Sequence, residues 1–207
     1  MSANKPNNSA AHVQQSAFCV ARMLGRSLAG GLVLAALSSG AMAATECNGP
    51  PLSGTIPDGV VVNDGDFCVL IEATVYDSVQ VNPGGILITC GSTIYGGLVA
   101  NGAANLIIGA GADEEGPPVG FVCPGNNIRG GVQISNTGPG VLAPAPSIAI
   151  ERDIIAGGVH LSNNAGPIVV STDVINGGLF CKNNASALED EGTPSVVVGR
   201  TTCEFGE

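Results

Sequence analysis

The stretch that decides the fold is residues 155–179, which read IAGGVHLSNNAGPIVVSTDVINGGL. It begins and ends with one pattern: an aliphatic residue, any residue, two glycines, and Val or Leu. The two copies start 20 residues apart. Between them lie a turn rich in Asn and Gly and the aliphatic run Ile168–Val170. Self-similarity at a fixed period of about 20 residues is typical of a chain built from stacked repeats.

The pattern recurs outward from this stretch toward the N-terminus. Good copies start at Ile94 and Ile128, and weaker copies start at Ile56 and Val75. Successive starts are 19, 19, 34, 27 and 20 residues apart. The two long spacings fit the same period if each contains an inserted loop, near 112–125 and 139–146. A further copy starting at Val197 overlaps an expected strand and is not counted.

Each repeat also contains a second β run, separated from the glycine pair by a turn. These turns contain Asn and Gly, which adopt left-handed backbone conformations at low cost, so one recurring corner is expected. A unit of about 20 residues with short strands and fixed corners predicts a single-domain, all-β, right-handed parallel β-helix of about six to seven coils. The alternative is an antiparallel β-sandwich, but that fold favours strict alternation of apolar and polar residues.

The N-terminus resembles an export signal. Lys5, Arg22 and Arg26 provide positive charge, Leu28–Leu37 is a ten-residue apolar stretch, and Ala41–Ala43 is a small-x-small cleavage site. We therefore expect a signal peptide over residues 1–43 and a repeat domain over 44–207. Retention of the leader as a membrane anchor is the alternative, although a spanning helix needs about 20 apolar residues. After cleavage no membrane insertion is expected.

Charge restricts the classes of partner. The whole chain has a formal net charge of −10, and loss of the leader removes three of its seven basic residues and none of its 17 acidic ones. Only Arg129, Arg152, Lys182 and Arg200 would remain to contact phosphates. Because nucleic-acid binding depends on neutralising phosphates with basic residues, nucleic acid is excluded as a partner.

Cysteine spacing matches the repeat. Cleavage would leave six of the seven cysteines, an even number that suits disulfides in an oxidising, secreted, periplasmic or cell-surface location. Cysteines about one repeat apart would lie on neighbouring coils, at a distance that a disulfide can span. One consistent set of pairs is Cys47–Cys68, Cys90–Cys123 and Cys181–Cys203. Zinc binding is a weaker alternative, because no C-x-x-C pair exists and only His160 would remain to ligate it.

Candidates for catalysis are few. Asp153 and Asp173 occupy the same place in successive repeats, and they could share one face with Arg152 and His160. Glycosidase chemistry needs two carboxylates about 5–10 Å apart in a cleft. The simpler interpretation places both acids at a solvated edge and His160 at a solvent-facing strand position. We therefore predict no catalytic residues, with Asp153, Asp173 and His160 as the weak alternative.

Acidic side chains also offer weak calcium candidates. Asp113, Glu114 and Glu115 form one cluster, and Asp64 and Asp66 flank a glycine. Carboxylate oxygens are the ligands that Ca²⁺ prefers, but neither segment has EF-hand spacing. Hydrated loops explain both segments more simply. The sequence accordingly predicts no metal and no cofactor.

The C-terminal part resembles a group of exported proteins. Gly177–Asn184, an acidic loop, Val198–Arg200 and Cys203 are similar to segments of uncharacterised exported bacterial proteins with β-helix-like repeats. The resemblance is specific over residues 175–203 and looser over 75–174, and Arg200 stands where those proteins usually have a second glycine. The resemblance implies secretion and a repeat fold, and it implies no activity.

These observations favour a secreted structural or adhesive module that lacks catalytic activity. A cell-surface glycan or a second copy of the chain are the expected partners. Two alternatives remain open: a carbohydrate-active β-helix enzyme, either hydrolase or lyase, and a self-assembling surface protein. A cleft lined by the candidate acids would support the enzyme.

Overall fold

The regular structure consists of β-strands that pair in parallel. A computed structural model describes residues 43–109, 123–191 and 193–206, and every regular element within these ranges is a strand. Val and Ile dominate the strands, as expected from the preference of β-branched residues for extended backbone. These residues belong to one unit, Gly40–Glu207. The described ranges include no helix of the length and hydropathy that crossing a membrane requires.

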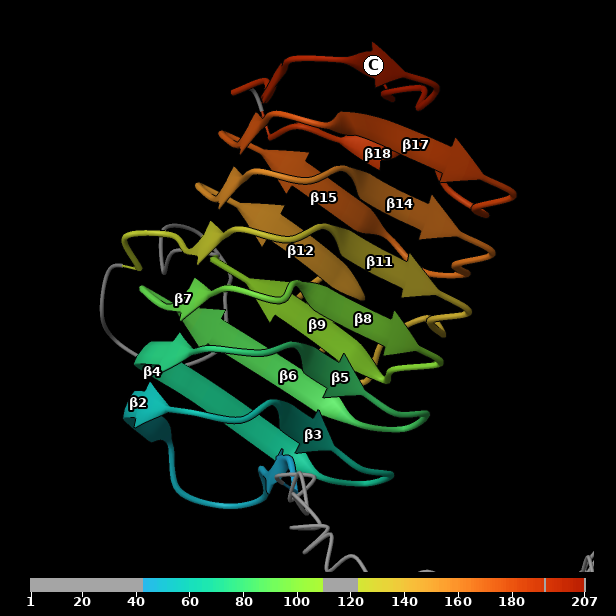
Figure 1. Cartoon of the computed structure of the whole chain (residues 1–207). Coiled ribbons are helices and arrows are strands. Elements are labelled where there is room, and N and C mark those ends of the chain that lie inside the picture. The colour runs from blue at the N-terminus through green and yellow to red at the C-terminus, as the bar shows by residue number, and fades with distance from the viewer. Residues whose placement is uncertain (1–42, 110–122, 192, 207) are drawn as a thin grey trace, which may run out of the picture. The chain divides into compact units, whose positions relative to one another are not determined.

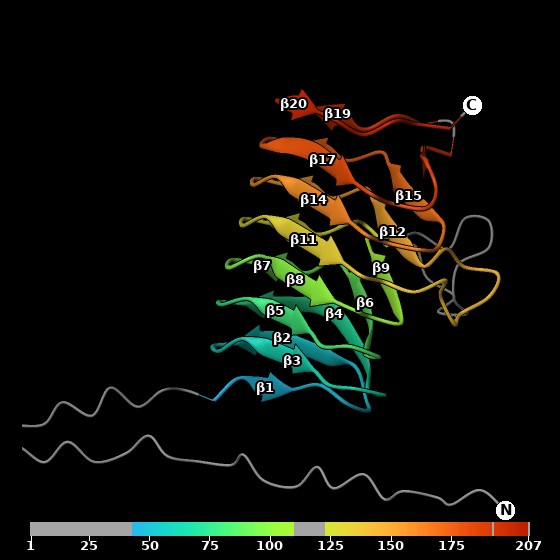
Figure 2. The same ribbon diagram turned by 90° about the vertical axis from the view of Figure 1, so that its right-hand side faces the viewer.

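One sheet contains eight strands, whose labels mark their order along the chain (Figures 1 and 2). Each strand between the two end strands pairs in parallel with the strand of the preceding repeat and with that of the following repeat. In order across the sheet they are β1 (Thr45–Glu46), β3 (Val60–Val62), β5 (Val79–Val81), β8 (Leu98–Asn101), β11 (Val132–Ser135), β14 (Val159–Ser162), β17 (Gly178–Lys182) and β20 (Arg200–Thr201).

The other sheet contains twelve strands and divides at its longest member, β4 (Phe67–Val75). The first half of β4 pairs with β6, and its end pairs with β7 and β2. On one side of β4 follow β6 (Ile86–Cys90), β9 (Asn105–Ile108), β12 (Ile148–Glu151), β15 (Ile168–Ser171) and β18 (Leu188–Glu189). On the other side follow β7 (Thr93–Ile94), β10 (Asn127–Ile128), β13 (Ile154–Ile155), β16 (Val174–Ile175) and β19 (Val196–Val197), while β2 (Leu52–Ile56) pairs with β4 alone.

The strand register confirms the predicted phase of the repeated pattern. Ile94 pairs with Ile128, Ile128 with Ile155, and Ile155 with Ile175. The long spacings therefore contain extra residues that leave the register unchanged. The predicted loop 139–146 lies in one of them, between β11 and β12. Most of the other predicted loop, near 112–125, lies outside the described residues.

The C-terminal copy that the sequence interpretation left uncounted is present, so that interpretation was wrong. Val197 pairs with Ile175, and Val196–Val197 therefore belongs to the strand that precedes the glycine position. The second β run of the preceding repeat is instead β18, which pairs with β15. The sequence misled because three consecutive valines fit either strand equally well.

The glycine pair allows neighbouring repeats to approach closely. A Cβ atom added at Gly157 would lie 2.6 Å from the backbone nitrogen of Gly131, and one added at Gly96 would lie 2.6 Å from the nitrogen of Ser78. Real Cβ atoms do not approach backbone atoms so closely, so glycine is required where the chain crosses between strands.

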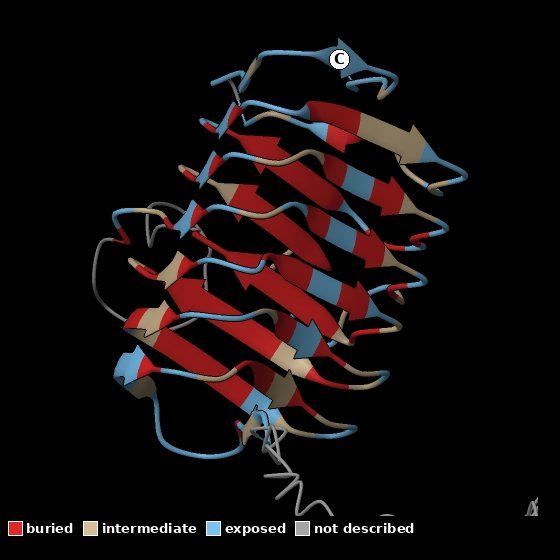
Figure 3. Cartoon of the chain, in the orientation of Figure 1, coloured by how far each residue is buried: buried red, intermediate tan, exposed pale blue. Residues whose placement is uncertain are grey.

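The core between the sheets is made of aliphatic side chains. Figure 3 shows the buried residues along the strands of both sheets. Alternate residues of the strands point inward, as in the buried–exposed–buried pattern of β14. A second, smaller cluster lies on the opposite face of the longer sheet and is formed by Val69, Ile88, Ile107 and Ala149. The loop between β11 and β12 contributes Ala145 to this cluster.

The corner that follows the eight-stranded sheet is the recurring Asn and Gly turn that the sequence predicts. Asn136, Asn163 and Asn183 have φ of 57°, 55° and 55°, and Gly84 and Gly102 have φ of 79° and 72°. Glycine and asparagine adopt this left-handed region more readily than other residues. Recurrence of the same geometry keeps successive strands in register.

The six cysteines in the described ranges form three disulfides. Their Cα–Cα distances are 5.2, 5.4 and 4.8 Å, and each bond joins residues of neighbouring repeats. The pairs are those expected from the spacing: Cys47–Cys68, Cys90–Cys123 and Cys181–Cys203. Three disulfides indicate that the chain folds in an oxidising environment.

Candidate functional site

Polar residues, most of them buried, directly precede the short strands β7, β10, β13, β16 and β19. They form a hydrogen-bonded ladder in which each of these residues is one rung. The side chain of each rung accepts a hydrogen bond from the backbone N–H of the corresponding residue one repeat earlier. Asp153 Oδ1 accepts from Asn126 N at 2.6 Å, Asp173 Oδ1 accepts from Asp153 N at 2.7 Å, and Ser195 Oγ accepts from Asp173 N at 3.0 Å. Ser92 accepts likewise from Ala73 at the start of the ladder, at 3.1 Å.

A sharp backbone turn points these side chains inward. The residues before Asp153 and Asp173 have a positive φ, 60° at both Arg152 and Thr172. Such values are rare for residues other than glycine, above all for a β-branched residue such as Thr172. Earlier repeats use Gly91 and Gly125, with φ of 63° and 84°. The strained corner is maintained because the following side chain gains a buried hydrogen-bond partner.

The two carboxyl groups occupy an environment that opposes ionisation. Burial raises the pKa of Asp153 from 3.8 to about 7, against the lowering effect of the hydrogen bonds from Asn126. Burial and, after it, the neighbouring Asp153 carboxyl together raise the pKa of Asp173 from 3.8 to about 8. Both side chains are only 1 % exposed, and among the described residues Asp153 Oδ2 has no hydrogen-bond partner.

The prediction that Asp153 and Asp173 lie at a solvated edge is wrong, because both are buried in the ladder. The suggestion that they share a face with His160 is also wrong: His160 is exposed on β14, in the other sheet. In the ladder each acid receives hydrogen bonds from backbone amides. This arrangement suits a carboxyl group that secures a corner.

His160 lies at the solvent-facing strand position that the sequence predicts. Its ring stacks on Phe180 of β17, with ring centroids 4.7 Å apart. Phe180 is the residue paired with His160 in the neighbouring strand. The imidazole therefore contributes to cross-strand packing on the outer surface.

Sequence reasoning missed an aromatic column on the outer surface. Tyr76 and Tyr95 stack with ring centroids 5.1 Å apart, and the guanidinium of Arg129 lies 4.4 Å from the centre of the Tyr95 ring. Each of the three follows the aliphatic residue that begins a repeat, so their common phase was the available signal. Tyr76 remains 55 % exposed.

Exposed aliphatic side chains continue beside this column on later repeats. Ile154, Val174 and Val196 pair in register and point outward, with exposed fractions of 51, 38 and 60 %. We define the contact face as these three residues with Tyr76 and Tyr95.

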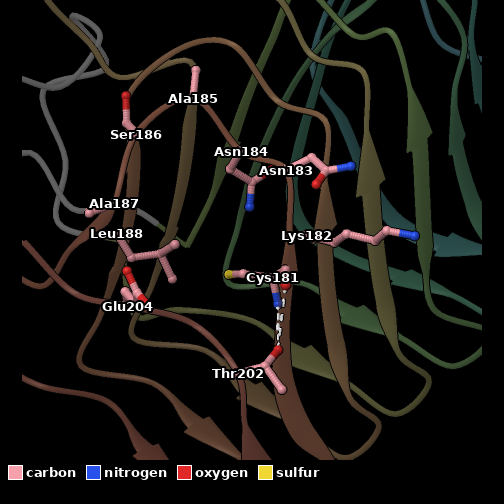
Figure 4. A pocket seen from close by; sticks show the side chains of 10 residues that line it. All are labelled: Cys181, Lys182, Asn183, Asn184, Ala185, Ser186, Ala187, Leu188, Thr202 and Glu204. Atoms are coloured by element: carbon pink, nitrogen blue, oxygen red, sulfur yellow. Dashed lines mark hydrogen bonds between the residues drawn. The ribbon is translucent and has the colours of Figure 1, made fainter.

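A small open pocket lies at the last repeat (Figure 4). Its volume is about 220 Å³, and its lining includes Asn184, Leu188, Thr202 and Glu204. Figure 4 shows Asn184 directed into the opening and Lys182 extending away from it. Neither Asp153 nor Asp173 lines this pocket, so it is not a catalytic cleft formed by the two ladder acids.

The calcium candidates are not brought together by the described structure. Asp66 Oδ2 accepts a hydrogen bond from Asn63 N at 3.1 Å, and Asp64 packs against Gly84, so both acids stabilise the corner. Asp113, Glu114 and Glu115 lie outside the described residues. Within the described ranges no group of three or more His, Cys, Asp or Glu side chains could hold a metal.

No protein-family model, no curated protein and no solved structure matches this chain. The functional interpretation therefore depends on three local features. These are the buried acidic ladder, the contact face and the terminal pocket. The ladder supports the fold, whereas the other two features face solvent.

Proposed function

We propose that the chain is a secreted, non-catalytic module, a right-handed parallel β-helix of about six to seven coils that presents an adhesive outer surface. The parallel register supports the helical winding, since each strand pairs with its counterpart one repeat later in the sequence. In a repeat the chain forms three short strand segments and then returns to the sheet from which it started. A chain that does so in every repeat is most simply wound as a solenoid.

One observation supports the absence of catalysis more than any other. Asp153 and Asp173, the best candidates for paired acid chemistry, are 1 % exposed and bind backbone amides of neighbouring coils. A glycosidase needs its two carboxyl groups in contact with substrate. The ladder instead gives both groups a structural role.

The disulfides support a location outside the reducing cytosol. Bonds between neighbouring coils occur near both ends of the repeat array, at Cys47–Cys68 and Cys181–Cys203. Terminal coils have a neighbour on one side only, so a covalent link offsets fraying. Together with the export-like leader, this supports a location in the periplasm, at the cell surface or in the medium.

The contact face supports adhesion. It combines exposed aromatic side chains on two adjoining coils with exposed aliphatic side chains on three later coils, and the coil between them carries Asn127 and Arg129. Exposed apolar side chains gathered on one side of a soluble protein favour an interaction site there. Tyrosine suits glycan contact because it has an apolar ring and a polar hydroxyl group.

The test is binding of the purified chain to a glycan array. We expect saturable binding to at least one glycan, and its loss in Tyr95→Ala. Val99→Ala is the matched control, because Val99 is 45 % exposed but lies on the other sheet. Equal loss in both variants, or no binding to any glycan, would contradict adhesion through this face.

Self-assembly is the second candidate. Among the described residues, β19 and β20 at the C-terminal end pair on one side only. An unpaired strand edge is a template for a further chain. A self-assembling protein would show concentration-dependent growth in light scattering, and the adhesive module would remain monodisperse.

A further inference from the structure

A second ladder, built from carboxamide side chains, runs along the Asn corner. Asn164 Oδ1 accepts a hydrogen bond from Thr137 N at 3.0 Å, and Asn184 Oδ1 accepts one from Asn164 N at 3.1 Å. Each rung also donates from Nδ2 to a strand carbonyl of the preceding repeat. The acceptors are Ile134 O at 3.4 Å and Leu161 O at 3.1 Å. Each of these carboxamides is therefore hydrogen-bonded through both its oxygen and its nitrogen.

The ladder stops at Asn184 because the last repeat lacks the corner. Cys203 is bonded to Cys181 and Phe205 pairs in parallel with Leu188, but Glu204 alone separates Cys203 from Phe205, where six residues separate Cys181 from Leu188. Among the described residues, no acceptor for the backbone N–H groups of Asn183 and Asn184 is present. In the preceding repeat the equivalent N–H groups donate to Lys182 O at 2.9 Å and to Asn184 Oδ1.

The terminal pocket lies where the next rung would be. Its lining includes Asn184 and Cys181, and Cys181 occupies the register position of Leu161, whose carbonyl receives the Asn184 side chain. Within the part of the chain that the structure describes, the carbonyl of Cys181 receives only the Thr202 hydroxyl, at the long distance of 3.5 Å. The pocket thus presents a backbone donor and a backbone acceptor in the arrangement that binds a carboxamide one repeat earlier.

We propose that this pocket binds a primary carboxamide, as carried by an asparagine side chain of a peptide. The carboxamide oxygen accepts from Asn184 N, and its nitrogen donates to Cys181 O. A carboxylate fits less well, because it has no proton to donate to that carbonyl and because Glu204 lines the pocket. A peptide carbonyl two residues before the asparagine would accept the N–H of Asn183, as Lys182 O accepts that of Asn163.

The test compares two capped dipeptides that differ in one group, N-acetyl-Asn-Asn-amide and N-acetyl-Asn-Asp-amide. Each is titrated into the full chain while the backbone amide signals of Cys181, Asn183 and Asn184 are followed by NMR. A ligand this small is limited to dissociation constants on the order of millimolar. We expect saturable shifts with the asparagine peptide and at least about tenfold weaker binding of the aspartate peptide.

Equal or tighter binding of the aspartate peptide, or shifts that do not saturate, would overturn the proposal. In a second arm, Asn184→Pro, which removes the donor N–H, should abolish the saturable shifts, whereas Asn176→Ala, at an exposed position outside the pocket, should retain them. Retained binding by a folded Asn184→Pro variant would also overturn the proposal. The peptide comparison uses the unaltered chain and so remains decisive if Asn184→Pro fails to fold. The pocket is separate from the contact face, so either can fail without the other.

Discussion

The backbone N–H of Asp153 donates to Oδ1 of Asp173 at 2.7 Å, which joins two buried acidic residues of successive repeats. A buried carboxyl group normally requires a cationic partner or a proton. Here backbone and side-chain donors supply the hydrogen bonds, and the raised pKa values indicate that protons neutralise the pair near pH 7. The relationship makes the stability of the fold depend on pH.

Stability should fall as the pH rises from about 4 to above 8. The folded pKa values, about 7 and about 8, exceed the ordinary value of 3.8, so the folded chain binds more protons than the unfolded chain between these limits. The contribution is complete below the unfolded pKa and is lost as the pH rises through the folded values, with a magnitude on the order of a few kcal/mol. Melting temperatures at pH 5, 7 and 9 measure it, and a higher melting temperature at pH 9 would contradict it.

Asp153→Asn should remove much of this pH dependence and raise the melting temperature at pH 9. Asparagine already occupies the preceding rung at Asn126, where Nδ2 donates to Asp153 Oδ1 at 2.9 Å, so the shape and hydrogen bonds suit the site. Asp153→Ala is the control, because it leaves the buried Asn126 N–H without an acceptor and should cost about 1–3 kcal/mol at any pH. Equal melting curves for the two variants would refute the ladder.

Gly157→Ala should destabilise the fold by about 1–3 kcal/mol, because its Cβ would meet the backbone of the preceding repeat. Gly138→Ala is the matched control. No atom lies within 4 Å of a Cβ added at Gly138, so this variant should remain near the unaltered stability. Chemical denaturation measures both, and a neutral Gly157→Ala would show that the repeats are not packed this closely.

Replacement of Cys181 and Cys203 by serine should lower the free energy of unfolding by about 2–4 kcal/mol. The bond closes a loop of 22 residues and links the last repeat to its neighbour. Thermal unfolding of the double variant, with the unaltered chain in reducing buffer as a control, measures the effect. An unchanged melting temperature would mean that this disulfide does not form.

The parallel register and the corners could be predicted because backbone geometry limits the residues allowed there. At the pair Gly157–Gly158 few residues other than glycine fit, because repeats approach closely there. Asparagine recurs at the position of Asn163 because that corner needs a positive φ. The cysteine pairs followed from the same period. The final repeat was misplaced because the valines at 196–198 carry no such constraint.

The burial of Asp153 and Asp173 could not be predicted from residue type, because charged side chains are usually exposed. Their phase contained the missing information: each directly precedes a short strand, at the position that Ser92 and Asn126 occupy in earlier repeats. A charged residue in phase with neutral polar ones indicates a shared internal hydrogen-bond pattern. The aromatic column was missed because its members are tyrosine and arginine, which have no common chemical class.

The central claim, that the acidic pair supports the fold and performs no catalysis, is tested most directly by a glycan turnover screen. The purified chain and Asp153→Asn are incubated with the same glycans, with and without Ca²⁺, and released products are measured by mass spectrometry. The account predicts no products from either protein. Products released by the unaltered chain and lost in Asp153→Asn, with the variant still folded, would contradict it and make the protein an enzyme.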